Sequence, residues 1–234
     1  QEIIDRCQAS MGALLDHRVD LTPDKEAFRY PDVDETWQSL TWRETRDRVH
    51  QYAAGLLSLG LGHEERVALA SSTRIEWILV DLAVNCAAGA TTAIYPNTTG
   101  DDFAHIITHS ESRIFVAENA EQLAKLRANS ELAAQVRSVV LIDGDDDADD
   151  VITLAELRER GVAHLAERPD AVRGAIASTD HDTLATLIYT SGTTGLPKGV
   201  RLTHLNWLYQ GEAVADLDIL YPEDVQYLWL PLAH

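Results

Sequence analysis

The chain has 234 residues, 45% hydrophobic and 24% charged, enough to bury one core of ordinary size or slightly more. Its formal net charge of −19 argues against nucleic acid or an anionic membrane as a partner, because both bind basic protein surfaces. No stretch approaches the roughly 18 apolar residues of a membrane span and no signal peptide is visible, so we expect a cytoplasmic protein with at most peripheral membrane contact.

The first sixty residues carry the marks of two helices and a hairpin. Residues 3–19 have apolar side chains at helical spacing, which predicts one opening helix. Two apolar runs within residues 28–40 predict a short hairpin. Thr41 and Glu44 have the spacing of a capping box, so they predict the start of a second helix, and Gly60 predicts its end.

The middle of the chain alternates between short β-rich runs and helical patterns. We expect strands at residues 66–70, 91–95, 113–117 and 136–142, helices at residues 75–88 and 103–109, and one or two helices within residues 121–134. This alternation predicts an α/β fold, in which mainly parallel sheets are flanked by helices. Such sheets bind nucleotides at the carboxyl ends of their strands. Two cysteines, Cys7 and Cys86, lie in apolar helical patterns, which predicts two buried, reduced thiols.

Six of the eight residues from 143 to 150 are aspartate. A calcium loop that began at Asp145 would need a glycine at its sixth position and a glutamate at its twelfth. Those positions hold Asp150 and Glu156, so only the second fits, and we interpret the run as a solvated loop.

The sequence predicts one more short helix before the chain becomes irregular. Thr153 and Glu156 form a second capping-box pattern, and Gly161 predicts the end of the helix that they begin. Residues 168–182 are expected to form an irregular linker that leads to the next strand.

A stretch rich in glycine and hydroxyl side chains follows an expected buried strand at residues 184–188. Residues 189–199 hold four serine and threonine hydroxyls, three glycines and one of the chain's three lysines. Glycines let backbone N–H groups approach a ligand, successive N–H groups form a nest for phosphate oxygens, and a lysine adds charge. The Walker spacing is absent. An ordinary surface turn is the alternative, but the position of a scarce lysine favours a phosphate-binding loop.

Beyond this loop we expect a second short strand, a helix at residues 206–217 and a strand at residues 225–230, with His234 just past the end of that strand. The string Y-T-S-G-T-T-G-L-P-K-G-V at residues 189–200 resembles the phosphate-loop signature of the adenylate-forming enzymes. Residues 202–206 and 230–234 fit the same family. Four shorter matches resemble its long-chain fatty-acyl-CoA synthetases: Arg74-Ile75-Glu76-Trp77, Gly89-Ala90, Ile94-Tyr95-Pro96 and His105-Ile106-Ile107.

This resemblance implies the N-terminal part of the large domain of an acyl-CoA synthetase-like fold. Residues 1–178 would form an N-terminal α/β subdomain, and residues 179–234 the start of a second subdomain that carries the phosphate loop. The implied small molecules are ATP, Mg²⁺ and coenzyme A, with a fatty acid as the second substrate. A homodimer is left open.

The resemblance also implies roles for particular residues. The nucleotide phosphates would be held by Thr190, Ser191, Gly192, Thr193, Thr194, Gly195 and Lys198. Thr190 would reach magnesium, and His234 would face the acyl carboxylate and the adenylate as a catalytic residue. A loop of this composition gains order from its anion, so we expect residues 191–198 to be mobile when empty.

By resemblance, the reaction is ATP-dependent activation of a long-chain fatty acid to an acyl-adenylate and then to acyl-CoA. The family's adenine motif, hinge and C-terminal lysine should lie downstream of residue 234, so these residues alone are expected to be inactive. Two alternatives stay open. One is another adenylate-forming enzyme, such as a carboxylic acid reductase or an aryl-CoA ligase, and the other is a non-catalytic nucleotide-binding fragment.

Overall fold

A computed structural model describes residues 2–32, 34–190, 195–221 and 223–233. The helices are α1 (Glu2–Arg6), α2 (Met11–Leu21), α3 (Trp42–Ser58), α4 (Ile75–Cys86), α5 (Gly100–Ser110), α6 (Ala120–Arg127), α7 (Ser130–Gln135), α8 (Leu154–Glu167), α9 (Ala171–Ala177) and α10 (His204–Ala215). The strands are β1 (Glu26–Pro31), β2 (Trp37–Thr41), β3 (Arg66–Ala70), β4 (Ala90–Ile94), β5 (Ile114–Ala117), β6 (Ser138–Leu141), β7 (Val151–Thr153), β8 (Leu184–Thr190) and β9 (Lys198–Thr203).

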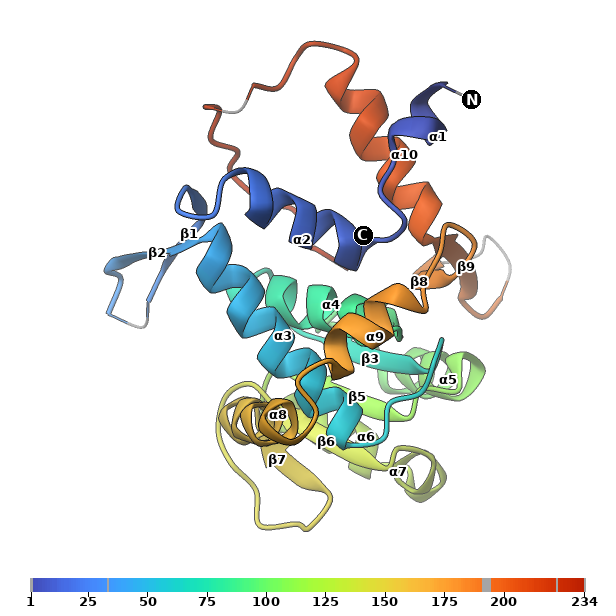
Figure 1. Ribbon diagram of the computed structural model, residues 1–234. Coiled ribbons are helices and arrows are strands. Elements are labelled where there is room, and N and C mark those ends of the chain that lie inside the picture. Colours follow the sequence, from blue (N-terminus) through green and yellow to red (C-terminus); the bar gives the residue numbers. More distant parts are fainter. Residues whose placement is uncertain (1, 33, 191–194, 222, 234) are drawn as a thin grey trace.

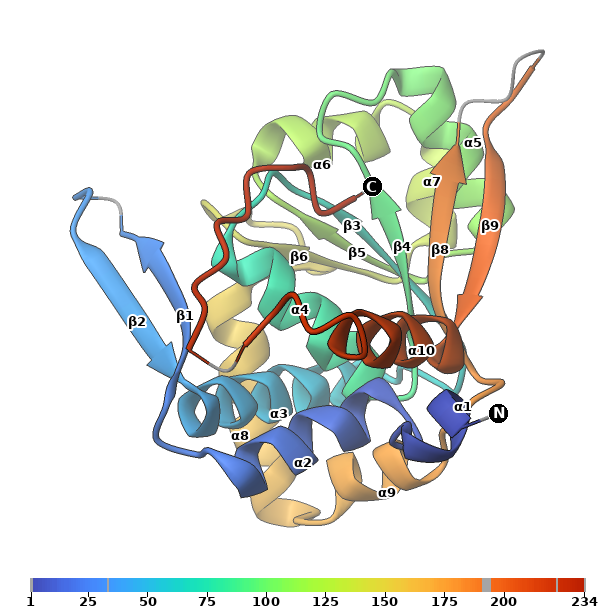
Figure 2. The ribbon, with the colours of Figure 1, turned by 90° about the horizontal axis from the view of Figure 1, so that it is seen from above.

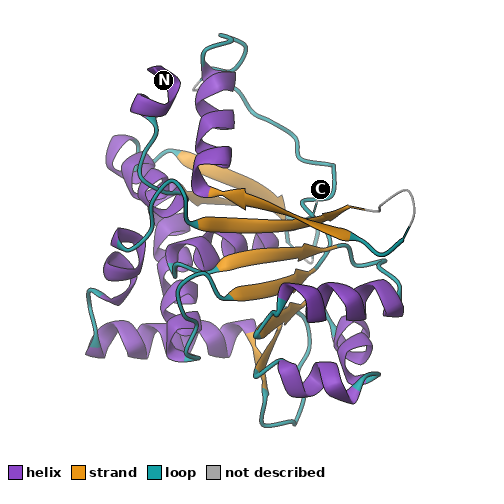
Figure 3. Ribbon diagram, turned by 90° about the vertical axis from the view of Figure 1, so that its right-hand side faces the viewer, coloured by secondary structure: helices purple, strands orange, loops and turns teal. Residues whose placement is uncertain are grey.

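A seven-stranded sheet with the order β7-β6-β5-β3-β4-β8-β9 forms the centre of the molecule (Figure 3). Every neighbouring pair is parallel except β8 and β9, which are antiparallel. All described residues of β4 and β5 are buried, as expected for strands covered on both faces. The predicted α/β fold with a mainly parallel sheet is therefore confirmed. The proposed boundary between residues 178 and 179 stays a prediction, and β8 pairs with β4 across it.

Helices cover both faces of this sheet and enclose two apolar cores (Figure 1). One core lies between the sheet and the helices α2, α3, α4, α8 and α9, and it takes Val67 and Leu69 from β3. The other lies under α5, α6 and α7 and takes Ala68 and Ala70. Because side chains alternate along a strand, consecutive residues of β3 supply opposite cores. The layered arrangement fixes the carboxyl ends of the parallel strands at one common edge.

The helix predicted for residues 3–19 is wrong in one respect, because the chain breaks between α1 and α2. Ser10 has extended backbone angles, and its hydroxyl accepts a hydrogen bond from the Ala13 backbone N–H at 3.3 Å. A serine in this position satisfies an N–H group that the first helical turn leaves free, so it starts a new helix. The apolar periodicity continues across the break and hides it. The capping boxes at Thr41 and Thr153 and the β1–β2 hairpin are confirmed.

Two further predictions are corrected between residues 154 and 182. Helix α8 does not end at Gly161 but continues to Glu167. Gly161 is a packing contact, since a Cβ there would lie 1.7 Å from the Gln51 carbonyl oxygen of α3. The segment expected to be irregular contains α9, whose Val172 and Ile176 are buried in the core.

The strand predicted for residues 225–230 is also wrong. These residues have no regular secondary structure, and Val225, Tyr227 and Trp229 are exposed. An apolar run needs a partner strand to form a sheet, and none of the described strands pairs with it. The aspartate-rich run forms a loop, as predicted, and there Asp146 forms an ion pair with Arg127 at 2.7 Å.

Both cysteines are free, Cys86 is buried, and Cys7 is only partly buried. Burial raises the pKa of each thiol above its ordinary value, which keeps both protonated near neutral pH. Among the residues that the structure describes, no helix has both the length and the apolar character to cross a membrane.

Candidate functional site

The two arms of the predicted phosphate loop lie side by side at the carboxyl edge of the sheet (Figure 2). Strand β8 ends at Thr190, strand β9 begins at Lys198, and these two residues are directly paired in the antiparallel register. Both are exposed. The structure therefore brings together a hydroxyl and an ammonium group that the sequence separates by eight positions, and it presents both to solvent.

Gly195 is a described residue inside the loop. Its φ of +141° lies in a region that side chains other than glycine rarely adopt, and a Cβ there would meet nothing within 4 Å. Backbone conformation, and not packing, is thus the reason for a glycine at this position. Ser191, Gly192, Thr193, Thr194 and His234 lie outside the described residues. Their predicted roles, and the predicted mobility of the empty loop, stay predictions.

Two histidines of α5 contact the residues that precede Thr190 and Lys198. His105 donates from Nε2 to the Pro197 carbonyl oxygen at 2.9 Å. His109 Nδ1 lies 2.8 Å from the Tyr189 hydroxyl. In the sequence, His105 stands out only as part of a family resemblance, and no pattern there predicts a role for His109. Two histidines four residues apart on a predicted helix were the available signal, but their partners lie 80 and 92 positions away.

The motif that follows the loop has a structural role. His204 is fully buried at the start of α10, and its Nδ1 accepts a hydrogen bond from the Met11 backbone N–H at 3.2 Å. Asn206 accepts from the Thr203 backbone N–H at 2.8 Å and so caps the same helix. Burial lowers the pKa of His204 to about 4, so this imidazole is neutral near pH 7.

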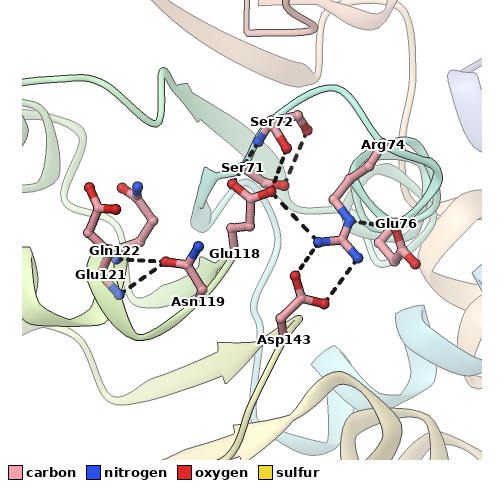
Figure 4. Close-up of polar contacts among 9 residues, drawn as sticks. All are labelled: Ser71, Ser72, Arg74, Glu76, Glu118, Asn119, Glu121, Gln122 and Asp143. Carbon is pink, nitrogen blue, oxygen red and sulfur yellow. Dashed lines mark hydrogen bonds and ion pairs between the residues drawn. The ribbon is translucent and has the colours of Figure 1, made fainter. Parts of the chain in front are cut away.

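The neighbouring part of the carboxyl edge, beyond β3, β5 and β6, is occupied by the protein's own charged side chains (Figure 4). Arg74 donates to Asp143 at 3.1 Å and to Glu76 at 2.7 Å, and it lies 3.7 Å from Glu118. Glu118 also accepts hydrogen bonds from the backbone N–H and the hydroxyl of Ser72. The close-up shows the carboxylates of Asp143, Glu76 and Glu118 converging on the Arg74 guanidinium, with Ser72 on the far side of Glu118. We call this group of five residues the closed edge, and Thr190 with Lys198 the open edge.

The closed edge lies between β3 and β5, where the strand order of the sheet predicts a crevice. Connections leave β3 and β5 toward opposite sides of the sheet, and ligands of open α/β sheets commonly bind at such a point. Here the bonds to Arg74 and Ser72 link the strand ends, and a cavity lined in part by Arg74, Glu76 and Asp143 opens beside them. Burial by itself would lower the pKa of Arg74, but its bonds to Asp143 and Glu76 outweigh burial and raise it. The closed edge therefore joins the ends of β3, β5 and β6 through the protein's own side chains.

The last described residues return to this edge of the sheet. The Thr73 hydroxyl, in the loop after β3, donates to the Leu230 carbonyl oxygen at 3.0 Å. Ala233 is buried, and Leu232 packs against the same core as α4. The C-terminal segment thus passes beside the ends of the central strands.

A mainly parallel sheet with a glycine- and hydroxyl-rich loop at its carboxyl edge defines a nucleotide-binding α/β fold. Residues 15–234 match the AMP-binding enzyme family, and the chain belongs to that family. The long-chain-fatty-acid–CoA ligase FadD15 of Mycobacterium bovis is 31% identical over 204 residues, which are 86% of this chain and 33% of the relative. The long-chain-fatty-acid–CoA ligase heimdall of Drosophila melanogaster is 29% identical, covering 85% and 30%. The chain thus spans about a third of these curated relatives.

Solved structures of the same fold cover nearly the whole chain. The apo structure of Mycobacterium smegmatis MbtA has a TM-score of 0.78 at 22% identity and covers 98% of this chain and 40% of that one. A long-chain-fatty-acid–CoA ligase, FadD1, of Archaeoglobus fulgidus has a TM-score of 0.76 at 20% identity, covering 96% and 42%. The anthranilate–CoA ligase AuaEII, in complex with anthranoyl-AMP, has a TM-score of 0.69 at 19% identity, covering 83% and 35%. At these identities the likeness establishes the fold alone.

Proposed function

We propose that the natural full-length chain containing these residues activates a long-chain fatty acid, with ATP, to an acyl-adenylate and pyrophosphate, and then transfers the acyl group to coenzyme A. The observation that carries this proposal is the open edge. There the strand register places Thr190 opposite Lys198 in a chain of the AMP-binding enzyme family. The curated relatives named for long-chain fatty acids support the acyl substrate.

In the first half-reaction, the acid's carboxylate oxygen attacks the α-phosphorus of ATP, and the bond from that phosphorus to the pyrophosphate oxygen breaks. Catalysis of such a displacement is mostly positioning and charge neutralisation. Lys198 supplies a mobile positive charge for the departing pyrophosphate, and Thr190 supplies a hydroxyl donor beside it. In the second half-reaction, the coenzyme A thiolate attacks the acyl carbon of the mixed anhydride, and AMP leaves.

Magnesium fits this site only as an ion held chiefly by the nucleotide. Within the described ranges, no group of three or more His, Cys, Asp or Glu side chains could hold a metal ion. The Thr190 hydroxyl at the open edge is the one oxygen ligand that we assign. Mg²⁺ commonly keeps several waters and binds through few protein oxygens together with substrate phosphates. Bound in this way, it would neutralise phosphate charge.

An aryl acid is the alternative substrate, because a fold neighbour of this chain is an anthranilate–CoA ligase. ATP/pyrophosphate exchange with a panel of acids tests both possibilities, using the natural full-length chain. We expect exchange that depends on acids with long alkyl chains. Exchange with benzoate-type acids alone would support the aryl alternative, and no exchange with any carboxylic acid would contradict adenylation.

A further inference from the structure

We infer that His105 and His109 are positioning residues that hold the two arms of the phosphate loop at the spacing that nucleotide binding needs. The inference rests on the proposed function for its effect on ATP, but its structural basis is separate. Each histidine contacts the residue directly before a member of the open edge. His105 holds Pro197, which precedes Lys198, and His109 holds Tyr189, which precedes Thr190.

The two contacts come from one rigid element. His105 and His109 are four residues apart on α5, so both point from the same side of the helix, and their ring centroids are 5.3 Å apart. The Tyr189 ring meets both imidazoles edge to face, with centroids at 6.3 Å and 5.8 Å. Helix α5 is anchored in turn by Phe103 and Ile107, which are fully buried. The histidines therefore hold both ends of the loop at fixed positions relative to α5.

The two arms pair with each other, and β8 also pairs with β4, but the β9 arm has little further support. Strand β9 has a single neighbour in the described sheet, β8, and Lys198 and Val200 are exposed. Its packing against β8 depends on Gly199, because a Cβ there would lie 3.0 Å from Cζ of Tyr189. Tyr189 is thus fixed between His109 and the β9 backbone. A displacement of Tyr189 or Pro197 would move Thr190 and Lys198 relative to each other.

The polar contacts have defined directions. A carbonyl oxygen only accepts, so His105 Nε2 carries the proton in its bond to Pro197. His109 Nδ1 can accept from the Tyr189 hydroxyl in the neutral imidazole or donate to it in the charged form, so this contact persists in both states. Phenylalanine at either position keeps a flat ring on the helix and removes the nitrogen. This substitution therefore tests the hydrogen bond while a somewhat larger aromatic ring stays in place.

The test uses His105→Phe, His109→Phe and the double variant in the natural full-length chain, with His17→Phe as the matched control. His17 is exposed on α2, which packs in the core on the opposite face of the sheet from α5. We expect each single variant to raise KM for ATP about fivefold, the factor carried by one lost neutral hydrogen bond. We expect kcat and KM for the acid to stay within twofold. This pattern arises when a substitution weakens the binding of one substrate equally in the ground state and the transition state. His109→Asn keeps an acceptor at the position of Nδ1 and should recover most of the loss.

A second measurement does not depend on catalysis. Backbone hydrogen exchange at Thr190 and Lys198 should become about fivefold faster in the histidine variants and stay unchanged in His17→Phe. Faster exchange in a protein that adenylates no acid would support the positioning role and contradict the proposed function. Unchanged exchange together with an unchanged KM for ATP would overturn the inference. A lower kcat together with equal changes in KM for ATP and for the acid would also overturn the inference, because that pattern indicates a general disturbance of the fold.

Discussion

The closed and open edges lie along the same side of one sheet and use charge in opposite ways. At the closed edge, Arg74 is hydrogen-bonded to Asp143 and Glu76, so its positive charge is neutralised by carboxylates of the same protein. At the open edge, Lys198 is exposed on an edge strand. The difference shows that a charged residue near a strand end is not by itself a sign of a ligand site. Substitutions at the closed edge and behind it should change stability, whereas those at the open edge should change nucleotide affinity.

The largest effect is expected behind the closed edge, where α8 packs on α3. In Gly161→Ala, the new Cβ would lie 1.7 Å from the Gln51 carbonyl oxygen, a backbone atom that cannot rotate away. We expect a loss of about 3 kcal/mol in the free energy of unfolding, measured by urea denaturation. Gly174→Ala in α9 is the control, because a Cβ there meets nothing within 4 Å. A Gly161→Ala variant as stable as the control would show that the two helices separate easily.

At the open edge, Lys198→Ala should weaken the handling of ATP by about 1.5–3 kcal/mol, the cost of a lost charge-assisted phosphate contact. The fold should be unaffected because the side chain is exposed. The measurement is the ATP dependence of ATP/pyrophosphate exchange, with the equally exposed Lys25→Ala as control. Exchange within twofold of the unsubstituted protein at sub-saturating ATP would remove Lys198 from the site.

Arg74→Met should lower the free energy of unfolding by about 1–2 kcal/mol, because Asp143, Glu76 and Glu118 would lose a shared partner at a partly solvated site. KM for ATP should not change. Arg173→Met removes an ion pair with Asp170 that is largely exposed, so its cost should stay below about 0.5 kcal/mol. An altered KM for ATP in Arg74→Met would mean that the closed edge takes part in nucleotide binding.

The smallest effect concerns His204, away from both edges. Its folded-state pKa of about 4 lies below the unfolded value near 6.5, so the unfolded chain binds more protons between these values. The contribution of this neutral imidazole is complete above pH 6.5 and is lost as the pH falls toward 4. At pH 5.5 the loss should be about 1 kcal/mol. Urea denaturation of His204→Gln should lack this part of the pH dependence, and an identical dependence in both proteins would contradict the assignment.

Local signals in the sequence predicted much of the fold. Apolar runs between turn residues gave β3 and β5 nearly to the residue, and the capping boxes at Thr41 and Thr153 are confirmed. The helix end predicted at Gly161 was wrong, because a single sequence does not distinguish a glycine that ends a helix from one that lets two helices pack closely. The run at residues 225–230 misled for a related reason, since its composition suits a strand but a strand also needs a partner.

For the candidate site, glycine and hydroxyl composition predicted roles for Thr190, Gly195 and Lys198, and these roles stay predictions. The sequence could not join His109 to Tyr189 or Arg74 to Asp143, pairs that meet only after the sheet is assembled. Nothing in the spacing of such residues indicates their contact. The composition of the loop is therefore readable from sequence, and the contacts that support its two ends are not.

The antiparallel pairing of β8 with β9 also bears on how the protein folds. Neighbouring parallel strands here are separated by a long loop, by one helix, or by several elements, as β3 and β5 are by α4, β4 and α5. Thr190 and Lys198, in contrast, meet across seven intervening residues. A loop of that length closes within tens of nanoseconds, and pairing of residues distant in sequence is much slower. The two arms of the phosphate loop can thus meet before the parallel sheet exists. The binding residues would then be assembled first, and the β4 edge and helix α5 would come to a unit already formed.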